Sequence, residues 1–480
     1  METLKEKTAK GLFWGGMNNV TQQIIGLVFG IILGRLLSPS DYGMMAVISV
    51  FPLIASALQN SGFTVALANM KVPEHRDYNS VFWFNIIVAL SSYLILFFCA
   101  PLIGAYNHNE ALVPLCRYAF LSVPIASFGT AQSAYLFKNL QARQQAKSAM
   151  TAVLSSSIVG VTMAWLGCSY WSLATQGLIF VTVNTLMQWH YSTWRPTMEI
   201  DFGPVRRMFR FSYKILATTI TTHINNNILN LLLGHYFSPR AAGYYNQAYQ
   251  WDFKCFSMIQ GMVNQVAQPV LVDLRDEEGR QLNAFRKMMR FTAFIAFPLM
   301  FGLALVSREF IVLAITDKWL TSAVLLQVLC LSGATMPIST LLSNMIISKG
   351  KSGIYFGVTL ALGIAQIILM MTIWPYGLRT MVVGYMALNV LWMFVWHYYT
   401  RRLTGYRFWL FMKDIVPFAV ASACVMGLTF IVTQTISNLV VLLLSRILIA
   451  VALYYVVMKC ARVKILDECM DFLFRKFRHN

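Results

Sequence analysis

Long apolar stretches recur along almost the whole chain and constrain its fold more than any other feature. A helix that crosses a bilayer needs about 20 mostly apolar residues. Windows of that length predict about fourteen membrane-spanning helices in the 480-residue chain. They lie near residues 11–36, 43–69, 79–105, 112–136, 148–167, 170–191, 211–237, 242–271, 288–314, 323–347, 353–374, 378–399, 412–435 and 439–459. The sequence therefore predicts an all-α, polytopic membrane protein.

Charged side chains are too few for a soluble protein of this size. Asp, Glu, Lys and Arg make up 12% of the residues and apolar residues make up 57%, whereas a typical soluble protein is about 25% charged. The same hydrophobicity excludes a disordered chain. The net charge is +19, but the chain lacks the polar surface on which a nucleic-acid-binding protein displays its basic face. We therefore expect a membrane protein without a nucleic-acid partner.

The distribution of basic residues predicts the topology. Loops on the cytoplasmic side of a membrane carry an excess of Lys and Arg. With the N-terminus in the cytoplasm, thirty of the 38 basic residues fall on the cytoplasmic side and five on the outside. We therefore expect both termini in the cytoplasm. The connecting loops are short, which leaves no room for a catalytic domain outside the membrane.

The eight cysteines predict neither a metal site nor a disulfide framework. They are scattered, mostly inside apolar stretches, without a C-x-x-C pair or a histidine at ligand spacing. Free cysteines in such surroundings behave as small apolar residues. We expect no metal, no cofactor and no catalytic residue.

An internal repeat divides the chain. Residues 33–43 (LGRLLSPSDYG) recur as residues 233–243 (LGHYFSPRAAG), with five identical positions at a constant offset of 200. In both copies a long helix ends, the chain turns at Ser-Pro, and the next helix begins. Six predicted helices separate the copies, so both lie on the outside in the same orientation, as in a parallel repeat. A weaker correspondence between the two copies is that Pro124 lies in the fourth predicted helix and Pro337 in the tenth.

The repeat predicts two lobes of six helices. We place an N-lobe with helices 1–6 at residues 1–200, a C-lobe with helices 7–12 at 201–410, and helices 13–14 with a basic cytoplasmic tail at 411–480. Two lobes of this kind enclose a cavity, and rocking of one lobe against the other opens it to each side of the membrane in turn. The sequence therefore indicates a transporter that works by alternating access.

Polar side chains inside the first helix of each predicted lobe mark the candidate substrate cavity. Such runs are costly against lipid, so we expect them to face the lobe interface, where amides and hydroxyls can bond a sugar-rich substrate. The alternative is that they only join helices by hydrogen bonds. The candidate residues are Asn18, Asn19, Gln22 and Gln23 in the first helix and His223, Asn226, Asn227 and Asn230 in the seventh.

Ionisable side chains within predicted spans are the second group of candidates. Arg117 lies in the fourth helix, and Asp252 and Lys254 lie in the eighth. A charge inside a membrane is a functional candidate by default. Arg117 or Lys254 could meet a phosphate, and Asp252 or His223 could carry a proton or a cation. Structural pairing between helices is the alternative, and it is the interpretation we favour for Arg446 in the last helix.

Several short stretches, from the first predicted helix to the tenth, match a known family. They are Gly11-Leu12-Phe13-Trp14, residues 34–43, Val81-Phe82-Trp83-Phe84-Asn85, Trp194-Arg195-Pro196, residues 238–246, Lys318-Trp319-Leu320 and Leu325-Leu326-Gln327. Through them the chain resembles the Wzx-like oligosaccharide flippases of the multidrug/oligosaccharidyl-lipid/polysaccharide (MOP) superfamily, in particular the branch of colanic-acid and teichuronic-acid exporters. Relatives of this branch often carry charged residues in the middle of the first helix, where this chain has Asn18 and Asn19.

The resemblance implies a fold of two six-helix lobes with two further helices, and it also implies a function. Members of the family are thought to move undecaprenyl-pyrophosphate-linked oligosaccharides across the bacterial cytoplasmic (inner) membrane for the biosynthesis of O-antigen, capsule or exopolysaccharide. We therefore expect a flippase and not an enzyme. Its partners would be this lipid-linked oligosaccharide, membrane lipid, a polysaccharide polymerase and glycosyltransferases. A proton (H+) or sodium (Na+) gradient could drive the cycle.

Three other functions remain open. A drug or cation antiporter of the MATE type would need a defined acid in a lobe cavity, and Asp252 is the acid that we place within the membrane. A membrane glycan polymerase or glycosyltransferase would need acids or a sizeable loop outside the membrane, where the predicted topology leaves Asp41, Glu110, Glu309 and Asp317. A scaffold without transport activity is also compatible with the composition.

Overall fold

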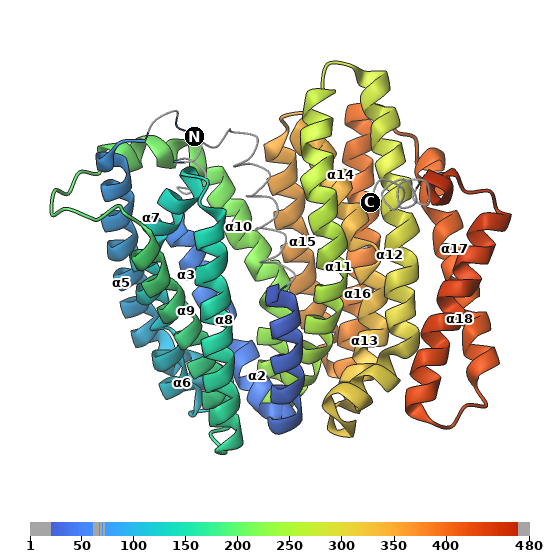
Figure 1. Cartoon of the computed structure of the whole chain (residues 1–480), viewed down its shortest axis with the longest axis horizontal. Helices are drawn as coiled ribbons and strands as arrows, with labels where there is room; N and C mark the ends of the chain where they lie inside the picture. Colours follow the sequence, from blue (N-terminus) through green and yellow to red (C-terminus); the bar gives the residue numbers. More distant parts are fainter. Residues whose placement is uncertain (1–20, 61–66, 68–69, 71–72, 469–480) are drawn as a thin grey trace. The chain divides into compact units, whose positions relative to one another are not determined.

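The computed structural model describes residues 21–60, 67, 70 and 73–468. Helices make up nearly all of this part of the chain, and it contains no strand (Figure 1). A helix bonds its own backbone N–H and C=O groups except at its ends, so it is an element that a lipid environment permits. The predicted all-α membrane fold is confirmed.

The helices form two compact units, Met1–Asn246 and Gln247–Asn480. The first contains the helix Thr21–Leu36, α2 (Pro39–Ile48), α3 (Val50–Asn60), α5 (His75–Tyr106), α6 (Leu112–Ala119), α7 (Ser122–Lys138), α8 (Ala142–Trp165), α9 (Tyr170–Tyr191), α10 (Gly203–Tyr236) and the start of α11 (Pro239–Asp273). The second contains the rest of α11, then α12 (Glu278–Ile315), α13 (Leu320–Gly333), α14 (Met336–Ser348), α15 (Ser352–Ile373), α16 (Leu378–Thr404), α17 (Phe408–Thr433) and α18 (Leu439–Cys460). Within the first unit α10 packs against α2, α3 and α5. The predicted lobe boundaries at residues 200 and 410 stay a prediction.

Ten helices of the described part of the chain are long and apolar enough to cross a membrane. They coincide with ten of the predicted spans, from Pro39–Gln59 to Leu439–Cys460. Helices also lie in the described parts of the other four predicted windows. Thr21–Leu36 is apolar but short in its described part, and α9, α10 and α11 fall outside the set of ten. The protein is therefore a multi-pass membrane protein, and the number of fourteen spans stays a prediction.

Proline interrupts equivalent helices in the two halves of the chain. The predicted fourth span consists of two helices, because α6 ends before α7 begins at Ser122, two residues before Pro124. The predicted tenth span is interrupted in the same way between α13 and α14, and α14 begins at Met336, directly before Pro337. Proline has no N–H to donate, and its ring clashes with the carbonyl four residues earlier. The shared proline position therefore coincides with a shared break in the helix.

The two copies of the sequence repeat begin a helix in the same way. Ser38 Oγ accepts a hydrogen bond from the N–H of Asp41 at 3.3 Å, at the start of α2. Ser238 Oγ accepts one from the N–H of Ala241 at 3.1 Å, at the start of α11. A serine in this position satisfies a backbone donor that the first helical turn leaves free, and proline at the next position needs no such partner. The repeated Ser-Pro is thus a repeated helix cap.

The two copies also cross each other within the first unit, at their glycines. A Cβ atom on Gly43 would lie 1.6 Å from the carbonyl oxygen of Pro239. A Cβ atom on Gly243 would lie 1.7 Å from the carbonyl oxygen of Pro39. This reciprocal geometry is what a two-fold-related repeat produces when its copies meet. Both positions require glycine because backbone contacts backbone, and no flexible side chain can move aside.

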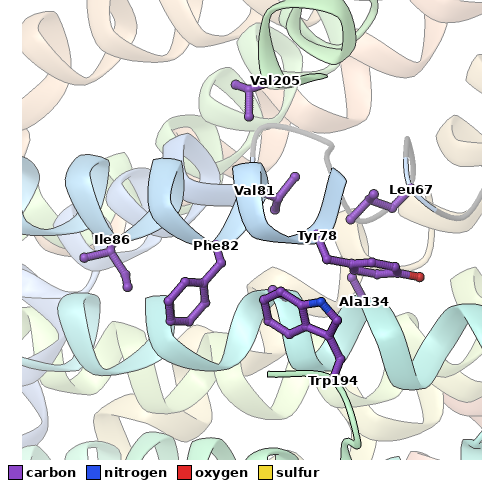
Figure 2. Packing of buried hydrophobic residues seen from close by; sticks show 9 residues of the cluster. Leu67, Tyr78, Val81, Phe82, Ile86, Ala134, Trp194 and Val205 are labelled. Carbon is purple, nitrogen blue, oxygen red and sulfur yellow. The ribbon is translucent and has the colours of Figure 1, made fainter. Parts of the chain in front are cut away.

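Aromatic residues from distant parts of the sequence form a core of the first unit (Figure 2). The ring of Phe82 in α5 lies 5.9 Å from that of Trp194, in the segment between α9 and α10. The next residue, Trp83, donates from its indole nitrogen to the carbonyl of Thr197 at 2.7 Å. Two of the stretches that carry the family resemblance therefore pack together and attach this segment to α5.

The glycine crossing leads to a first prediction. We expect Gly43→Ala and Gly243→Ala each to destabilise the protein by about 1–3 kcal/mol, the usual cost of overpacking. Gly177→Ala in α9 is the matched control, because an added methyl group there would have no atom within 4 Å. Thermal unfolding in detergent measures the effect as a lower Tm for the first two variants alone. Equal Tm values for all three variants would contradict the crossing.

Candidate functional site

The structure places the predicted site residues in both units. Gln22, Gln23, Arg117, His223, Asn226, Asn227 and Asn230 lie in the first unit, and Asp252 and Lys254 lie in the second. Asn18 and Asn19 lie outside the described residues. Gln22 is half-buried and Gln23 is exposed, and as adjacent residues they are about 100° apart around their helix. The predicted cavity between two lobes stays a prediction.

Four of the candidates form one polar face of α10. His223, Asn226, Asn227 and Asn230 are spaced at i, i+3, i+4 and i+7, which places them on one side of a helix. Asn226 is exposed, His223 and Asn227 are half-buried, and Asn230 is buried. The amide of Asn227 donates to the carbonyl of His223 at 3.0 Å. Within the described part of the chain, Oδ1 of Asn230 has no hydrogen-bond partner. This face presents amide donors and acceptors that can bond sugar hydroxyls.

Arg117 in α6 is a cation that forms no ion pair with a described carboxylate. Its guanidinium carbon lies 4.3 Å from the ring centroid of Phe97. Its Nε lacks a hydrogen-bond partner among the described residues. A cation–π contact holds the guanidinium in place and leaves its N–H donors available. Arg117 can therefore receive an anion.

Lys254 and Asp252 occupy different surroundings although they are two residues apart on α11. The Lys254 ammonium lies 4.5 Å from the ring centroid of Trp251 and makes no ion pair within residues 73–468. Asp252 is 3% exposed, and its carboxyl lies beside Gly333 of α13. Positions i and i+2 do not face each other on a helix. The two charges are thus separate features and not a local pair.

Sequence reasoning missed a polar hollow along α11. A cavity of about 520 Å³ is lined by Asn264, Gln265, Gln268, Pro269, Val272 and Asp273. Asn264 also accepts a hydrogen bond from the amide of Asn344 in α14 at 2.9 Å. The signal was present in the sequence, because Gln260, Asn264 and Gln268 recur every four residues and form a polar stripe.

Arg446 in α18 has a structural role, in agreement with the interpretation from its place in the last helix. Its guanidinium donates to Glu309 of α12 at 2.7 Å and to the carbonyl of Leu305 at 3.0 Å. A third bond reaches the hydroxyl of Thr433 in α17 at 3.3 Å. The side chains of the ion pair are 8% and 4% exposed. This buried pair connects the last two helices to α12.

A second buried carboxylate of the same unit also has an arginine partner. Asp414 of α17 accepts two hydrogen bonds from Arg286 of α12, at 2.8 and 3.0 Å, and one from the Tyr406 hydroxyl at 2.8 Å. Burial, and then the Asp414 carboxylate, raise the pKa of Tyr406, so the hydroxyl remains a donor at neutral pH. The sequence did not predict this contact, because its members are 128 residues apart.

The described residues include no group of three or more His, Cys, Asp or Glu that could hold a metal ion. The site residues in this part of the chain therefore offer amides, one imidazole, two cations and one carboxyl. Groups of this kind bind a ligand by hydrogen bonds and charge.

Solved structures with a similar fold are transporters. The chain aligns with the lipid II flippase MurJ in an inward closed conformation with a TM-score of 0.77 and 15% identity, over 94% of this chain and 99% of that one. It aligns with an inward-facing multidrug resistance MATE family transporter of the MOP superfamily with a TM-score of 0.65 and 15% identity, over 80% and 94% of the two chains. The chain therefore has the MOP transporter fold.

The chain belongs to the family described as polysaccharide biosynthesis proteins, which it matches over residues 32–324. It is 24% identical to the lipopolysaccharide biosynthesis protein WzxC of Escherichia coli K12 over 360 residues, which cover 74% of this chain and 72% of the relative. It is 23% identical to the teichuronic acid biosynthesis protein TuaB of Bacillus subtilis 168, over 76% and 77% of the two chains. The resemblance to Wzx-like flippases of the MOP superfamily is confirmed.

The Arg446–Glu309 pair leads to a second prediction. Arg446→Met leaves Glu309 buried without its partner, which costs about 3–5 kcal/mol, so we expect a large fall in Tm in detergent. The double variant Arg446→Met/Glu309→Leu removes both charges and should recover most of the Tm. If the single and double variants unfold at the same temperature, the pair is not what attaches α18.

Proposed function

We propose that the chain translocates an undecaprenyl-pyrophosphate-linked oligosaccharide across the bacterial cytoplasmic membrane for surface polysaccharide biosynthesis. The glycan and pyrophosphate pass along the polar groups of the protein, and the polyprenyl tail stays in lipid. The observation that carries the proposal is that a polysaccharide biosynthesis protein holds two cations in apolar surroundings. Arg117 and Lys254 each lack a carboxylate partner in the described part of the chain, and each lies over an aromatic ring.

The anionic link between lipid and sugar suits these two cations. An arginine or lysine in low-dielectric surroundings attracts a phosphate strongly. Isolated cations are costly in a membrane, so a transported anion would offset that cost when it binds. A MATE-like antiporter of cationic drugs would instead favour acids in these positions. The likeness to a MATE transporter, at 15% identity, concerns the fold alone.

The glycan part of the substrate suits the amides. The α10 face that contains Asn226 and the α11 hollow that contains Gln265 both present side-chain amides, in separate units. An amide offers both a donor and an acceptor, so it can bond hydroxyl groups in several orientations. Translocation by alternating access needs no covalent step, and we therefore assign the chain transport rather than catalysis. A polymerase and glycosyltransferases would act on the product and precursor of this step.

Deletion of the gene tests the proposed function. Lipid-linked repeat units should accumulate on the cytoplasmic leaflet, and the surface polysaccharide should disappear and return with a plasmid copy. Extracted lipid-linked intermediates, quantified by mass spectrometry, provide the readout. Normal polysaccharide in a strain without a paralogue contradicts the proposal, and raised drug sensitivity with intact polysaccharide favours the MATE-like alternative.

A third prediction concerns the two cations. Arg117→Gln and Lys254→Gln should each reduce polysaccharide export by about tenfold or more, because a hydrogen bond to a charged group contributes about 1.5–3 kcal/mol. Lys413→Gln, at an exposed lysine of α17, is the matched control and should leave export unchanged. Protein levels in the membrane fraction show whether each variant folds. Export at the wild-type level in both variants would contradict a contact between the pyrophosphate and these two cations.

A fourth prediction concerns the polar face of α10. Asn226 is exposed, so Asn226→Leu should leave the fold intact. Export should fall several-fold, because a sugar hydroxyl gives up its hydrogen bond to water on binding and leucine offers none in its place. Asn226→Gln keeps the amide and should recover part of the activity. If the leucine variant exports normally, the face serves helix packing instead.

A further inference from the structure

Asp252 differs from the other buried acids of the second unit. Glu309 and Asp414 are buried, and each meets an arginine. Asp252 is 3% exposed, yet it forms no ion pair with any residue that the structure describes. A structural acid inside a membrane protein is normally paired, because an isolated buried charge is costly. The unpaired carboxyl of Asp252 therefore indicates a role other than a structural ion pair.

The surroundings of the Asp252 carboxyl are apolar and tightly packed. A Cβ atom added to Gly333 of α13 would lie 2.5 Å from Oδ1 of Asp252 and 2.5 Å from the terminal methyl of Met300 in α12. The glycine therefore makes the room in which the carboxyl lies. Cys330, one turn earlier on α13, hydrogen-bonds the carboxyl, and Oδ1 has no hydrogen-bond partner in the described part of the chain.

Among the described residues, the ionisable groups around Asp252 include no cation that would hold it as a carboxylate. Asp252 acts electrostatically on Tyr249 and Cys255 of α11 and on Cys330 of α13, which places these three groups near it. Tyr385 of α16 acts on Tyr249 in turn. Lys254 lies over the ring of Trp251 instead. Phenol and thiol groups remain neutral in apolar surroundings, so they supply no positive charge.

The same surroundings distinguish a proton from a metal cation. Hard cations in proteins are surrounded by several oxygen ligands. Beside the Asp252 carboxyl lie the Cys330 thiol, Gly333 and the terminal methyl of Met300, and Tyr249 adds one phenol oxygen, so the described surroundings fall short of the several oxygen ligands that a metal cation needs. A proton needs no such cage, because one O–H bond neutralises the carboxylate.

We propose that Asp252 is the proton-binding site of the transport cycle, protonated when α11 packs against Gly333 and Cys330 and ionised when that packing opens to water. In the open state the O–H bond of the carboxylic acid breaks and the proton passes to water. In the closed state a proton from water binds the carboxylate again. The inference rests on the proposed function and specifies its coupling ion as H+ in place of Na+.

Vesicles that contain the purified full chain and an undecaprenyl-pyrophosphate-linked oligosaccharide test the coupling. A membrane-impermeant glycan probe measures how much substrate faces outward. A gradient of one pH unit supports about a tenfold ratio of substrate across the two leaflets per proton exchanged. Asp252→Asn should reduce this ratio to one. Asp276→Asn, in the exposed turn after α11, is the matched control and should keep the ratio.

Infrared difference spectroscopy tests the protonation without any substrate. The protein in lipid should show a carboxylic-acid C=O band near neutral pH that vanishes in Asp252→Asn, and Gly333→Ala should shift its frequency.

If the wild-type vesicles transport nothing, the proposed function fails and the band still decides the role of Asp252. Transport that follows a sodium gradient, or a ratio unchanged in Asp252→Asn, overturns the proton site and leaves the flippase proposal standing. Absence of the Asp252 band also overturns it.

Discussion

The hydrocarbon part of a membrane offers no water, so each polar group of this chain needs a partner inside the protein or inside its substrate. Helices satisfy the backbone. The buried acids Asp414 and Glu309 are satisfied by Arg286 and Arg446, and both pairs attach the last helices to α12. Against this background the unpaired groups stand out. Arg117, Lys254 and Asp252 form no ion pair in the described part of the chain, and the proposed function and its coupling both rest on them.

The internal repeat carries structural information beyond its five identical residues. Its serines cap two helices in the same way, and its glycines bring two backbone segments into direct contact. The contact is reciprocal, so a substitution in one copy also disturbs the other. The prolines at 124 and 337 accompany equivalent helix breaks. Repeated sequence here means repeated geometry, as expected of a transporter built from two related halves.

The fold class was largely predictable from the sequence, because hydropathy is a local signal that lipid enforces. The structural role of Arg446 followed from its place in the last helix. The contact between Arg286 and Asp414 did not, since nothing local relates residues 128 positions apart. The four-residue spacing of the polar stripe at Asn264 was visible in the sequence, but the hollow that it lines depends on how α11 packs against its neighbours.

Family signatures were less informative about the site than about packing. Phe82 and Trp194 belong to two stretches that carry the resemblance, and they lie in one aromatic core (Figure 2). These residues pack the core and do not identify a substrate. Asn230 was a candidate substrate contact from the sequence, but its burial and the lack of a described partner for its Oδ1 are structural information. That information exists only once the helices have been placed.

Movement of the lipid-linked substrate from one leaflet to the other tests the proposed translocation most directly. Vesicles with purified protein and a fluorescent undecaprenyl-pyrophosphate-linked oligosaccharide can be exposed to an impermeant reagent that destroys the glycan label on the outer leaflet. The account predicts that the label is lost completely with wild-type protein, and only by half in vesicles without protein. Loss of half the label in both would contradict it.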